Sequence, residues 1–206
     1  MIRRLAEAIG RPTVSRETFE RLEIYAALLR DEAARQNLIS ASTLDCLWER
    51  HILDSAQLVR FEPEPGASWA DIGSGAGLPG IVVATLVSGP VLLIEPRRLR
   101  ATFLQRVVDE LGLMDRVSVA AAKAERISGR FDVITARAVA SLDRLLEIST
   151  HLSTRKTRWL LPKGRGVESE LAQARRNWHC EAESVSSCTD PHSEILVLHG
   201  VKARGG

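Results

Sequence analysis

The first third of the chain repeats apolar residues at intervals of three and four, the spacing of one helix face. This pattern predicts a short helix over residues 2–9 and a long helix over residues 15–36, with Ser15 as a candidate N-cap. A further helical region, in one or two pieces, is expected over residues 42–59. Two prolines and a glycine within residues 62–66 then end the pattern, because neither residue continues a helix well.

From residue 67 onward, short apolar segments alternate with helical patterns. Strands are predicted over residues 69–72, 91–94, 117–120, 131–135 and 159–161, and helices over residues 79–87, 97–111, 142–152 and 167–178. This alternation is typical of βαβ units around a parallel sheet. Two final apolar segments, residues 181–187 and 195–201, predict a closing antiparallel hairpin. We therefore expect an α/β protein: a helical segment (1–66) that packs as one compact unit on a core (67–206) with a mostly parallel seven-stranded sheet.

The amino-acid composition narrows the classes of protein to which the chain can belong. The chain has 206 residues, of which 45% are hydrophobic and 26% charged, as in ordinary globular proteins. No apolar run approaches the roughly 18 residues needed to cross a bilayer, and no signal peptide is recognisable, so we expect a cytoplasmic protein without a membrane segment. The three cysteines form no C-x-x-C pair, which argues against a disulfide framework or a zinc site, and no metal is expected.

Charge is unevenly distributed around a net value of +2. Residues 1–66 carry 9 basic and 11 acidic side chains, whereas residues 67–206 carry 19 and 15. Seven basic residues and two acidic ones fall within residues 151–176, and 24 of all 28 basic residues are arginine, whose planar guanidinium suits phosphates and base edges. A polyanionic partner fits this distribution, but so does an ordinary solvated surface.

The clearest candidate binding motif is D-I-G-S-G-A-G-L-P-G at residues 71–80. It lies between the first predicted strand and the first helix of the core. This context is that of a nucleotide-binding loop, in which glycines let a ligand approach the backbone. Two cofactors compete for it. The glycines at 75, 77 and 80 match the dinucleotide pattern G-x-G-x-x-G. Counted from the strand end, however, the loop is G-x-G-x-G through Gly73, Gly75 and Gly77, which resembles the loop of S-adenosylmethionine-dependent methyltransferases.

Two carboxylates suit the second cofactor. Asp71, just before the loop, can bind the ammonium group of S-adenosylmethionine, and Glu95, after the second strand, can accept both hydroxyl groups of its ribose. In a purely structural interpretation, the glycines make a tight turn and Glu95 caps the helix that follows it. Because the acid, the glycines and the second acid occur in register, we predict cofactor binding.

The end of the fourth strand indicates which acceptor is methylated. Residues 134–142 lack the Asn/Asp-Pro-Pro-aromatic motif of enzymes that methylate exocyclic amines, and no cysteine lies between residues 68 and 179 to attack a cytosine. Both base chemistries therefore lose support. An acceptor that needs neither deprotonation nor covalent activation, such as guanine N7, remains.

Five motifs occur in one order: N-L-I-S at 37–40, R-H-I-L-D-S at 50–55, the glycine loop, R-A-V-A-S-L at 137–142 and K-G at 163–164. Together they resemble the RsmG (GidB) family of bacterial ribosomal RNA guanine-N7 methyltransferases. The resemblance implies a class I methyltransferase fold, S-adenosylmethionine, and a guanine in the decoding region of 16S ribosomal RNA, free or in the small ribosomal subunit. We expect the protein to act as a monomer.

The resemblance also implies site residues. Those at the cofactor would be Gly73, Leu78, Ala124, Glu125 and Arg137. The sequence departs from the family at residue 99, where leucine replaces the first residue of a usual Lys-Arg pair, and at residues 135–136, where Thr-Ala replaces the usual serine.

We hypothesise in-line methyl transfer to N7, driven by positioning and desolvation without a general base. Arg137 and Lys163, at the ends of the fourth and fifth strands, would hold the RNA phosphate or guanine O6. His51, Asn37 and Asp54 are expected to form a structural polar cluster between the N-terminal helices and the glycine loop. The alternatives are a class I methyltransferase acting on a small molecule or protein, and a non-catalytic dinucleotide-binding module.

Overall fold

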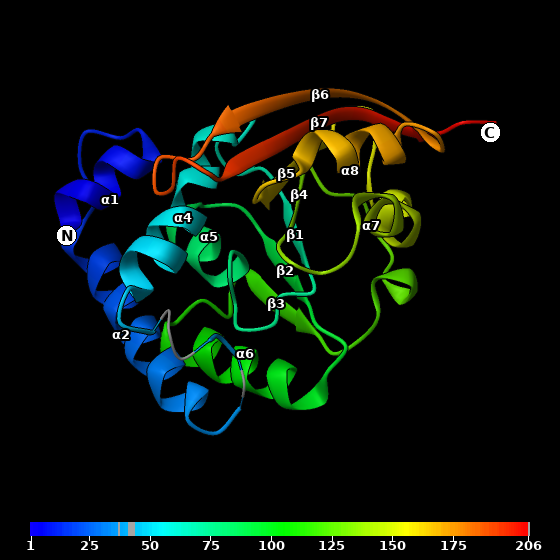
Figure 1. Ribbon diagram of the computed structural model, residues 1–206. Helices are drawn as coiled ribbons and strands as arrows, with labels where there is room; N and C mark the ends of the chain where they lie inside the picture. The colour runs from blue at the N-terminus through cyan, green and yellow to red at the C-terminus, as the bar shows by residue number, and fades with distance from the viewer. Residues whose placement is uncertain (37, 41–43, 206) are drawn as a thin grey trace.

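The computed structural model describes residues 1–36, 38–40 and 44–205. Within these residues, one sheet has the strand order β3-β2-β1-β4-β5-β7-β6 (Figure 1). Strands β1 to β5 run parallel, and β7 is antiparallel to both β5 and β6, which confirms the predicted fold class. The strands are β1 (Trp69–Ile72), β2 (Val91–Ile94), β3 (Val117–Ala120), β4 (Val133–Ala136), β5 (Arg158–Lys163), β6 (Trp178–Ser186) and β7 (Glu194–Ala203).

Helices cover both faces of the sheet (Figure 1). Helices on one face share a core cluster with the N-terminal segment, and those on the other share a second cluster. On the first face lie α1 (Ile2–Ile9), α2 (Arg16–Ala33), α5 (Gly80–Leu86) and α6 (Arg98–Glu110), and on the second α7 (Leu142–Ser149) and α8 (Val167–Ala174). The two faces follow from strand alternation, since Val133 belongs to the first cluster and its neighbour Ile134 to the second.

The region between α2 and β1 is a series of short turns of different pitch. It contains a π-helix η1 (Trp48–Leu53), α4 (Asp54–Ala56) and a 3-10 helix η2 (Gln57–Phe61). The predicted helix 42–59 is thus broken into pieces, and residues 42 and 43 lie outside the described part of the chain. π-helical turns are frequent at functional sites.

Two further differences concern helix ends. The prediction of a helix to residue 178 is wrong, because α8 ends at Ala174 and Trp178 begins β6. The Trp178 side chain is buried in the second core cluster, and its indole Nε1 donates to Asp143 Oδ1 at 2.9 Å, which places the residue in the sheet. The predicted helix 142–152 ends as a 3-10 turn, η4 (Thr150–Leu152).

The N-terminal helices pack directly on the glycine loop. Tyr25 of α2 is fully buried, and its hydroxyl donates to the carbonyl of Ala76 at 2.9 Å. Burial raises the pKa of this phenol, so the hydroxyl remains a donor. Arg11, after α1, donates to the carbonyl of Leu86 at the end of α5, at 3.1 Å. Residues 1–36 therefore help to fix the loop that precedes α5.

Among the described helices, none is both long enough and apolar enough to cross a membrane.

Tyr25→Phe is expected to lower the free energy of unfolding by about 1–2 kcal/mol, because the buried Ala76 carbonyl loses its donor. Urea unfolding of the two proteins measures the difference. The control is Ile24→Ala, at an exposed position on the same helix, which should change stability by less than about 0.5 kcal/mol. Equal stability of Tyr25→Phe and the wild type would show that the hydrogen bond contributes nothing.

Candidate active site

A cavity of about 340 Å³ opens at the carboxyl ends of β1, β2 and β4. We call it the cofactor cavity. Ligands of doubly wound sheets bind at this edge. Its walls come from the ends of the strands and from the turns that follow them: Ile72, Gly73, Ile94, Glu95, Pro96, Arg97, Arg100, Lys123, Ala124, Glu125, Ala138, Val139 and Ile148.

Gly73 lines the cofactor cavity. Its φ of 68° lies in the left-handed region, and its N–H donates to the carbonyl of Ile94 at 2.8 Å. A Cβ atom here would lie 2.7 Å from Val139 Cγ2, far inside van der Waals contact. Glycine is therefore required at this position, because the segment after β4 packs directly against the loop.

Glu95 joins the loop to the next helix. Its carboxylate is 3% exposed; Oε2 accepts from the Gly75 N–H at 2.9 Å, and Oε1 accepts from the Arg97 N–H at 2.7 Å. The bond to Arg97 is at the N-cap of α6, as the structural interpretation expected. Glu95 also lines the cofactor cavity. The same side chain is therefore placed both for the structural role and for the predicted contact with the ribose.

Asp71 and Leu78 do not line the cofactor cavity. The Asp71 carboxylate is 2% exposed; Oδ1 accepts from the Thr135 hydroxyl at 2.9 Å, and Oδ2 accepts from the Gly80 N–H at 3.1 Å. Leu78 is buried in the first core cluster. The loop therefore turns these two side chains toward the interior, and their contact with a cofactor stays a prediction.

The turn after β3 supplies another wall of the cofactor cavity. Ala124 and Glu125, both expected there, lie in the short 3-10 helix η3 (Ala124–Arg126), which periodicity did not predict. Sequence reasoning also missed Lys123 and Arg97, which line the cavity beside Ala124 and Glu95. Each of these residues follows the end of a strand by three positions, and this location in the sequence could have identified both as candidates.

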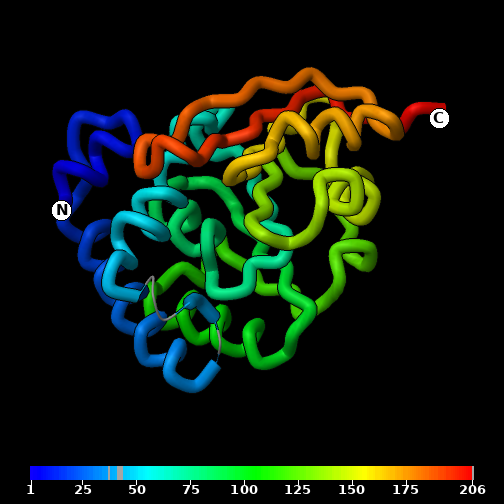
Figure 2. Tube along the Cα trace, viewed as in Figure 1, coloured from blue at the N-terminus to red at the C-terminus, as the bar shows by residue number. Residues whose placement is uncertain are grey.

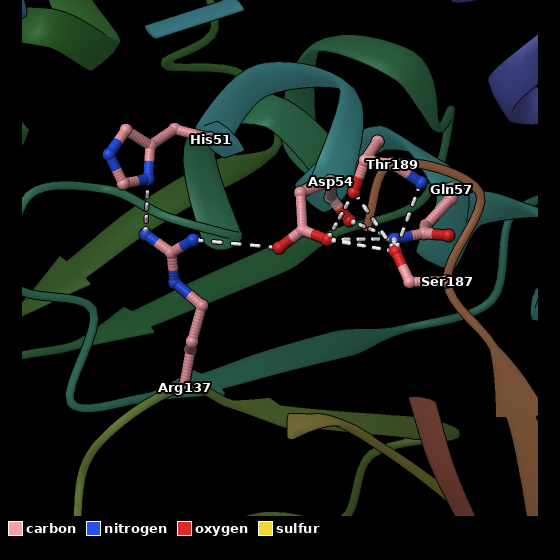
Figure 3. A network of polar contacts seen from close by, with 6 residues as sticks. All are labelled: His51, Asp54, Gln57, Arg137, Ser187 and Thr189. Atoms are coloured by element: carbon pink, nitrogen blue, oxygen red, sulfur yellow. Dashed lines mark hydrogen bonds and ion pairs between the residues drawn. The ribbon is translucent and has the colours of Figure 1, made fainter. Parts of the chain in front are cut away.

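Arg137, at the end of β4, belongs to a polar network instead of the cofactor cavity (Figure 3). Its Nη2 lies 3.3 Å from His51 Nδ1, and its Nη1 lies 3.7 Å from Asp54 Oδ2. Burial, followed by the charges of Arg137 and Arg50, lowers the pKa of His51 to about 4. His51 is therefore neutral at pH 7, and Nδ1 can accept from the guanidinium.

The other oxygen of Asp54 binds the loop between β6 and β7 (Figure 3). Asp54 Oδ1 accepts from Thr189 Oγ1 at 2.9 Å and from Gln57 Nε2 at 2.9 Å, while Gln57 Oε1 accepts from the Cys188 N–H at 2.9 Å. Within the described residues, the expected polar cluster at His51 and Asp54 contacts the β6–β7 loop and the end of β4. Asn37 lies outside the described residues.

A second cavity of about 300 Å³ adjoins the first, since Ala138 lines both. We call it the acceptor cavity. It contains both residues expected to position the substrate, and its walls are Asp54, Arg137, Ala138, Pro162, Lys163, Gly164, Ser193 and Glu194. Lys163 Nζ forms an ion pair with Glu170 Oε2 at 2.8 Å, and Glu170 Oε1 accepts from the Leu142 N–H at 2.8 Å. Lys163 is thereby tied to the start of α7.

The fold is that of class I methyltransferases. A solved S-adenosylmethionine-dependent methyltransferase from Aquifex aeolicus aligns with a TM-score of 0.58 at 16% identity, covering 75% of this chain and 92% of that one. A mutant of MtNAS in complex with S-adenosylmethionine aligns with a TM-score of 0.60 at 17% identity, covering 87% and 74%.

The chain belongs to the GidB family, rRNA small subunit methyltransferase G, whose model matches residues 18–196. Two relatives carry the name ribosomal RNA small subunit methyltransferase G. That of Rhizorhabdus wittichii is 46% identical, covering 93% of this chain and 90% of the relative, and that of Sphingopyxis alaskensis is 49% identical, covering 90% and 80%. The cofactor of this protein is S-adenosylmethionine. Glu95 lines the cofactor cavity, and its carboxylate can accept a hydrogen bond from a ribose hydroxyl in addition to those from Gly75 and Arg97.

Glu95→Gln is expected to weaken binding of S-adenosylhomocysteine by about 10- to 150-fold, because a charged acceptor is lost beside the cavity. Isothermal titration calorimetry measures the affinity. Glu110→Gln, at an exposed end of α6, is the control and should bind within about twofold of the wild type. Unchanged binding by Glu95→Gln would remove Glu95 from the cofactor contacts.

Asp71 predicts a pH dependence of stability. Burial raises the pKa of its carboxyl group from 3.8 to about 6, against the hydrogen bonds from Thr135, Ser74 and Gly80. The folded state therefore binds the proton more tightly than the unfolded state. The resulting stabilisation is full below about pH 4 and is lost as the pH rises through about 6.

In Asp71→Asn this titration is absent, while the amide can still accept from Gly80 and donate to Thr135. From pH 4.5 to 7.5 the wild type should lose stability relative to Asp71→Asn, by on the order of 2 kcal/mol. Urea unfolding at several pH values measures both proteins. Parallel stability curves would contradict the assignment.

Proposed function

We propose that this protein transfers a methyl group to N7 of a guanine in the decoding region of 16S ribosomal RNA. It would act in the cytoplasm, as a monomer. The names of the two relatives support the ribosomal RNA of the small subunit as the substrate. The observation that carries the proposal is the junction of two cavities at Ala138, one fitting the methyl donor and one lined by Arg137 and Lys163.

The chemistry of N7 suits the groups around the acceptor cavity. When bound, S-adenosylmethionine supplies a methyl group on a sulfonium, and N7 has an in-plane lone pair with no proton to remove. A general base is therefore unnecessary. His51 directs Nδ1 at Arg137, and Asp54 already accepts hydrogen bonds from the β6–β7 loop. These residues fix the guanidinium in place, and catalysis then rests on positioning and exclusion of water.

The RNA backbone would contact exposed arginines and lysines outside both cavities. Of the seven basic residues within 151–176, five are exposed: Arg155, Lys156, Arg165, Arg175 and Arg176. Arg158 is instead half-buried, with Nη1 donating to the carbonyl of Phe61 at 2.9 Å. Contacts of this kind release counterions, so RNA affinity should fall steeply with salt.

The decisive experiment supplies the purified protein with S-adenosylmethionine carrying a radiolabelled methyl group. The substrates are small ribosomal subunits, and separately 16S RNA, from cells that lack this gene. Label should appear in the RNA, at one guanine, and render that nucleotide sensitive to borohydride and aniline. Label on protein or on small molecules alone would favour the alternative methyltransferase activities. Binding of NAD in place of S-adenosylhomocysteine would favour a dinucleotide-binding module.

Arg137→Ala and Lys163→Ala should each lower the single-turnover rate of methylation by about 10-fold or more, since each removes a charged donor from the acceptor cavity. Affinity for S-adenosylhomocysteine should stay within about threefold, because neither side chain lines the cofactor cavity. The matched control is Arg106→Ala, an exposed arginine of α6. Wild-type rates in either variant would exclude that residue from substrate positioning.

A further inference from the structure

The residues around the two cavities lie along the sheet edge in the order of the strands. Along the carboxyl edge, Glu95 follows β2, Gly73 follows β1, Arg137 follows β4 and Lys163 ends β5. Because β7 runs antiparallel, its first residue, Glu194, pairs with Lys163 at the same edge. Neighbouring strands are about 4.8 Å apart, so β7 lies roughly 10 Å beyond β4. Glu194 thus closes the acceptor cavity on the side farthest from the cofactor cavity.

Glu194 offers a carboxylate that forms no ion pair within the described part of the chain. Its half-buried side chain lines the acceptor cavity, and the Ser184 hydroxyl donates to Oε2. The ammonium of the neighbouring Lys163 is paired with Glu170 instead. A carboxylate has about four lone-pair directions, so Glu194 can accept further hydrogen bonds from a ligand.

Guanine presents complementary groups on opposite edges. N7 and O6, both acceptors, lie on one edge, and the N1–H and N2–H₂ donors lie on the other. Two adjacent donors match the two oxygens of a carboxylate. Adenine presents an unprotonated N1 on that edge, which a carboxylate repels. Enzymes that act on a base outside its stack commonly recognise this Watson–Crick edge.

We propose that Glu194 selects guanine in the acceptor cavity by accepting hydrogen bonds from N1–H and N2–H₂. In this arrangement Arg137 donates to O6, and N7 faces the cofactor cavity across Ala138. Only β5 lies between β4 and β7 in the sheet, and Arg137 and Glu194 both line the acceptor cavity. This inference rests on the proposed function, and it assigns base specificity to a residue outside the motifs found in the sequence.

The test measures discrimination between guanosine and inosine at the methylated position. Inosine keeps N7, O6 and N1–H but lacks the N2 amine. The wild type should methylate a 16S RNA with guanosine at this position about 10- to 100-fold faster, in single turnover, than one with inosine. In Glu194→Gln the side-chain NH₂ group faces one of the guanine N–H donors, and two donors form no hydrogen bond. The rate with guanosine should therefore fall about 10-fold or more. The ratio between guanosine and inosine should shrink to within about threefold.

Glu183→Gln on β6 makes the same charge change at an exposed site and should keep the wild-type ratio. Glu194→Ala should also lose discrimination, and both Glu194 variants should bind S-adenosylhomocysteine like the wild type. If the wild type methylates guanine N7 and the ratio is unchanged in both Glu194 variants, this inference is overturned while the proposed function stands. If the wild type transfers no methyl group to guanine N7, the proposed function fails first.

Discussion

Two buried carboxylates hold the glycine loop on which both cavities depend. Asp71 binds the start of α5 and the fourth strand through Gly80 and Thr135, and Glu95 binds Gly75 and the start of α6. Burying a carboxylate is costly unless hydrogen bonds satisfy it. The loop must therefore adopt the conformation that supplies these donors. Glycine at position 73 then lets the segment after β4 pack against the loop, and Ala138 of this segment lines both cavities.

Parts of the chain that are distant in sequence meet at Arg137. The helical segment supplies His51 and Asp54, and the β6–β7 loop, seen reaching that segment in Figure 2, binds Asp54 and Gln57. The guanidinium is thus fixed by contacts about 85 residues away in sequence, and those contacts are fixed by a loop more than 130 residues away. The N-terminal helices and the final hairpin therefore both contribute to the site, although neither contains the glycine loop.

The sequence was most informative where local pattern determines structure. Strands β1, β2 and β3 have the predicted bounds, because each is a short, largely apolar segment flanked by turn or helix residues. Position in the chain also placed Gly73, Glu95 and Ala124 at the sheet edge. The sequence pattern does not predict which way the side chain of a loop residue points. For this reason the sequence predicts cofactor contacts for Asp71 and Leu78, although neither lines the cofactor cavity. Glu194 carries no local signal, since only the antiparallel pairing of β5 and β7 brings it beside Lys163.

The charges around the acceptor cavity suit a neutral base better than a phosphate. Lys163 forms an ion pair with Glu170, and Arg137 forms one with Asp54, in which Nη1 lies 3.7 Å from Oδ2. With Glu194 added, three carboxylates lie near these two cations, which leaves little net positive charge to attract an anion. Phosphate binding then falls to exposed residues such as Arg165 and Arg175, while the cavity offers donors on one side and an acceptor on the other. Under the proposed function, RNA affinity would come from the surface and base selection from the carboxyl edge of β4, β5 and β7.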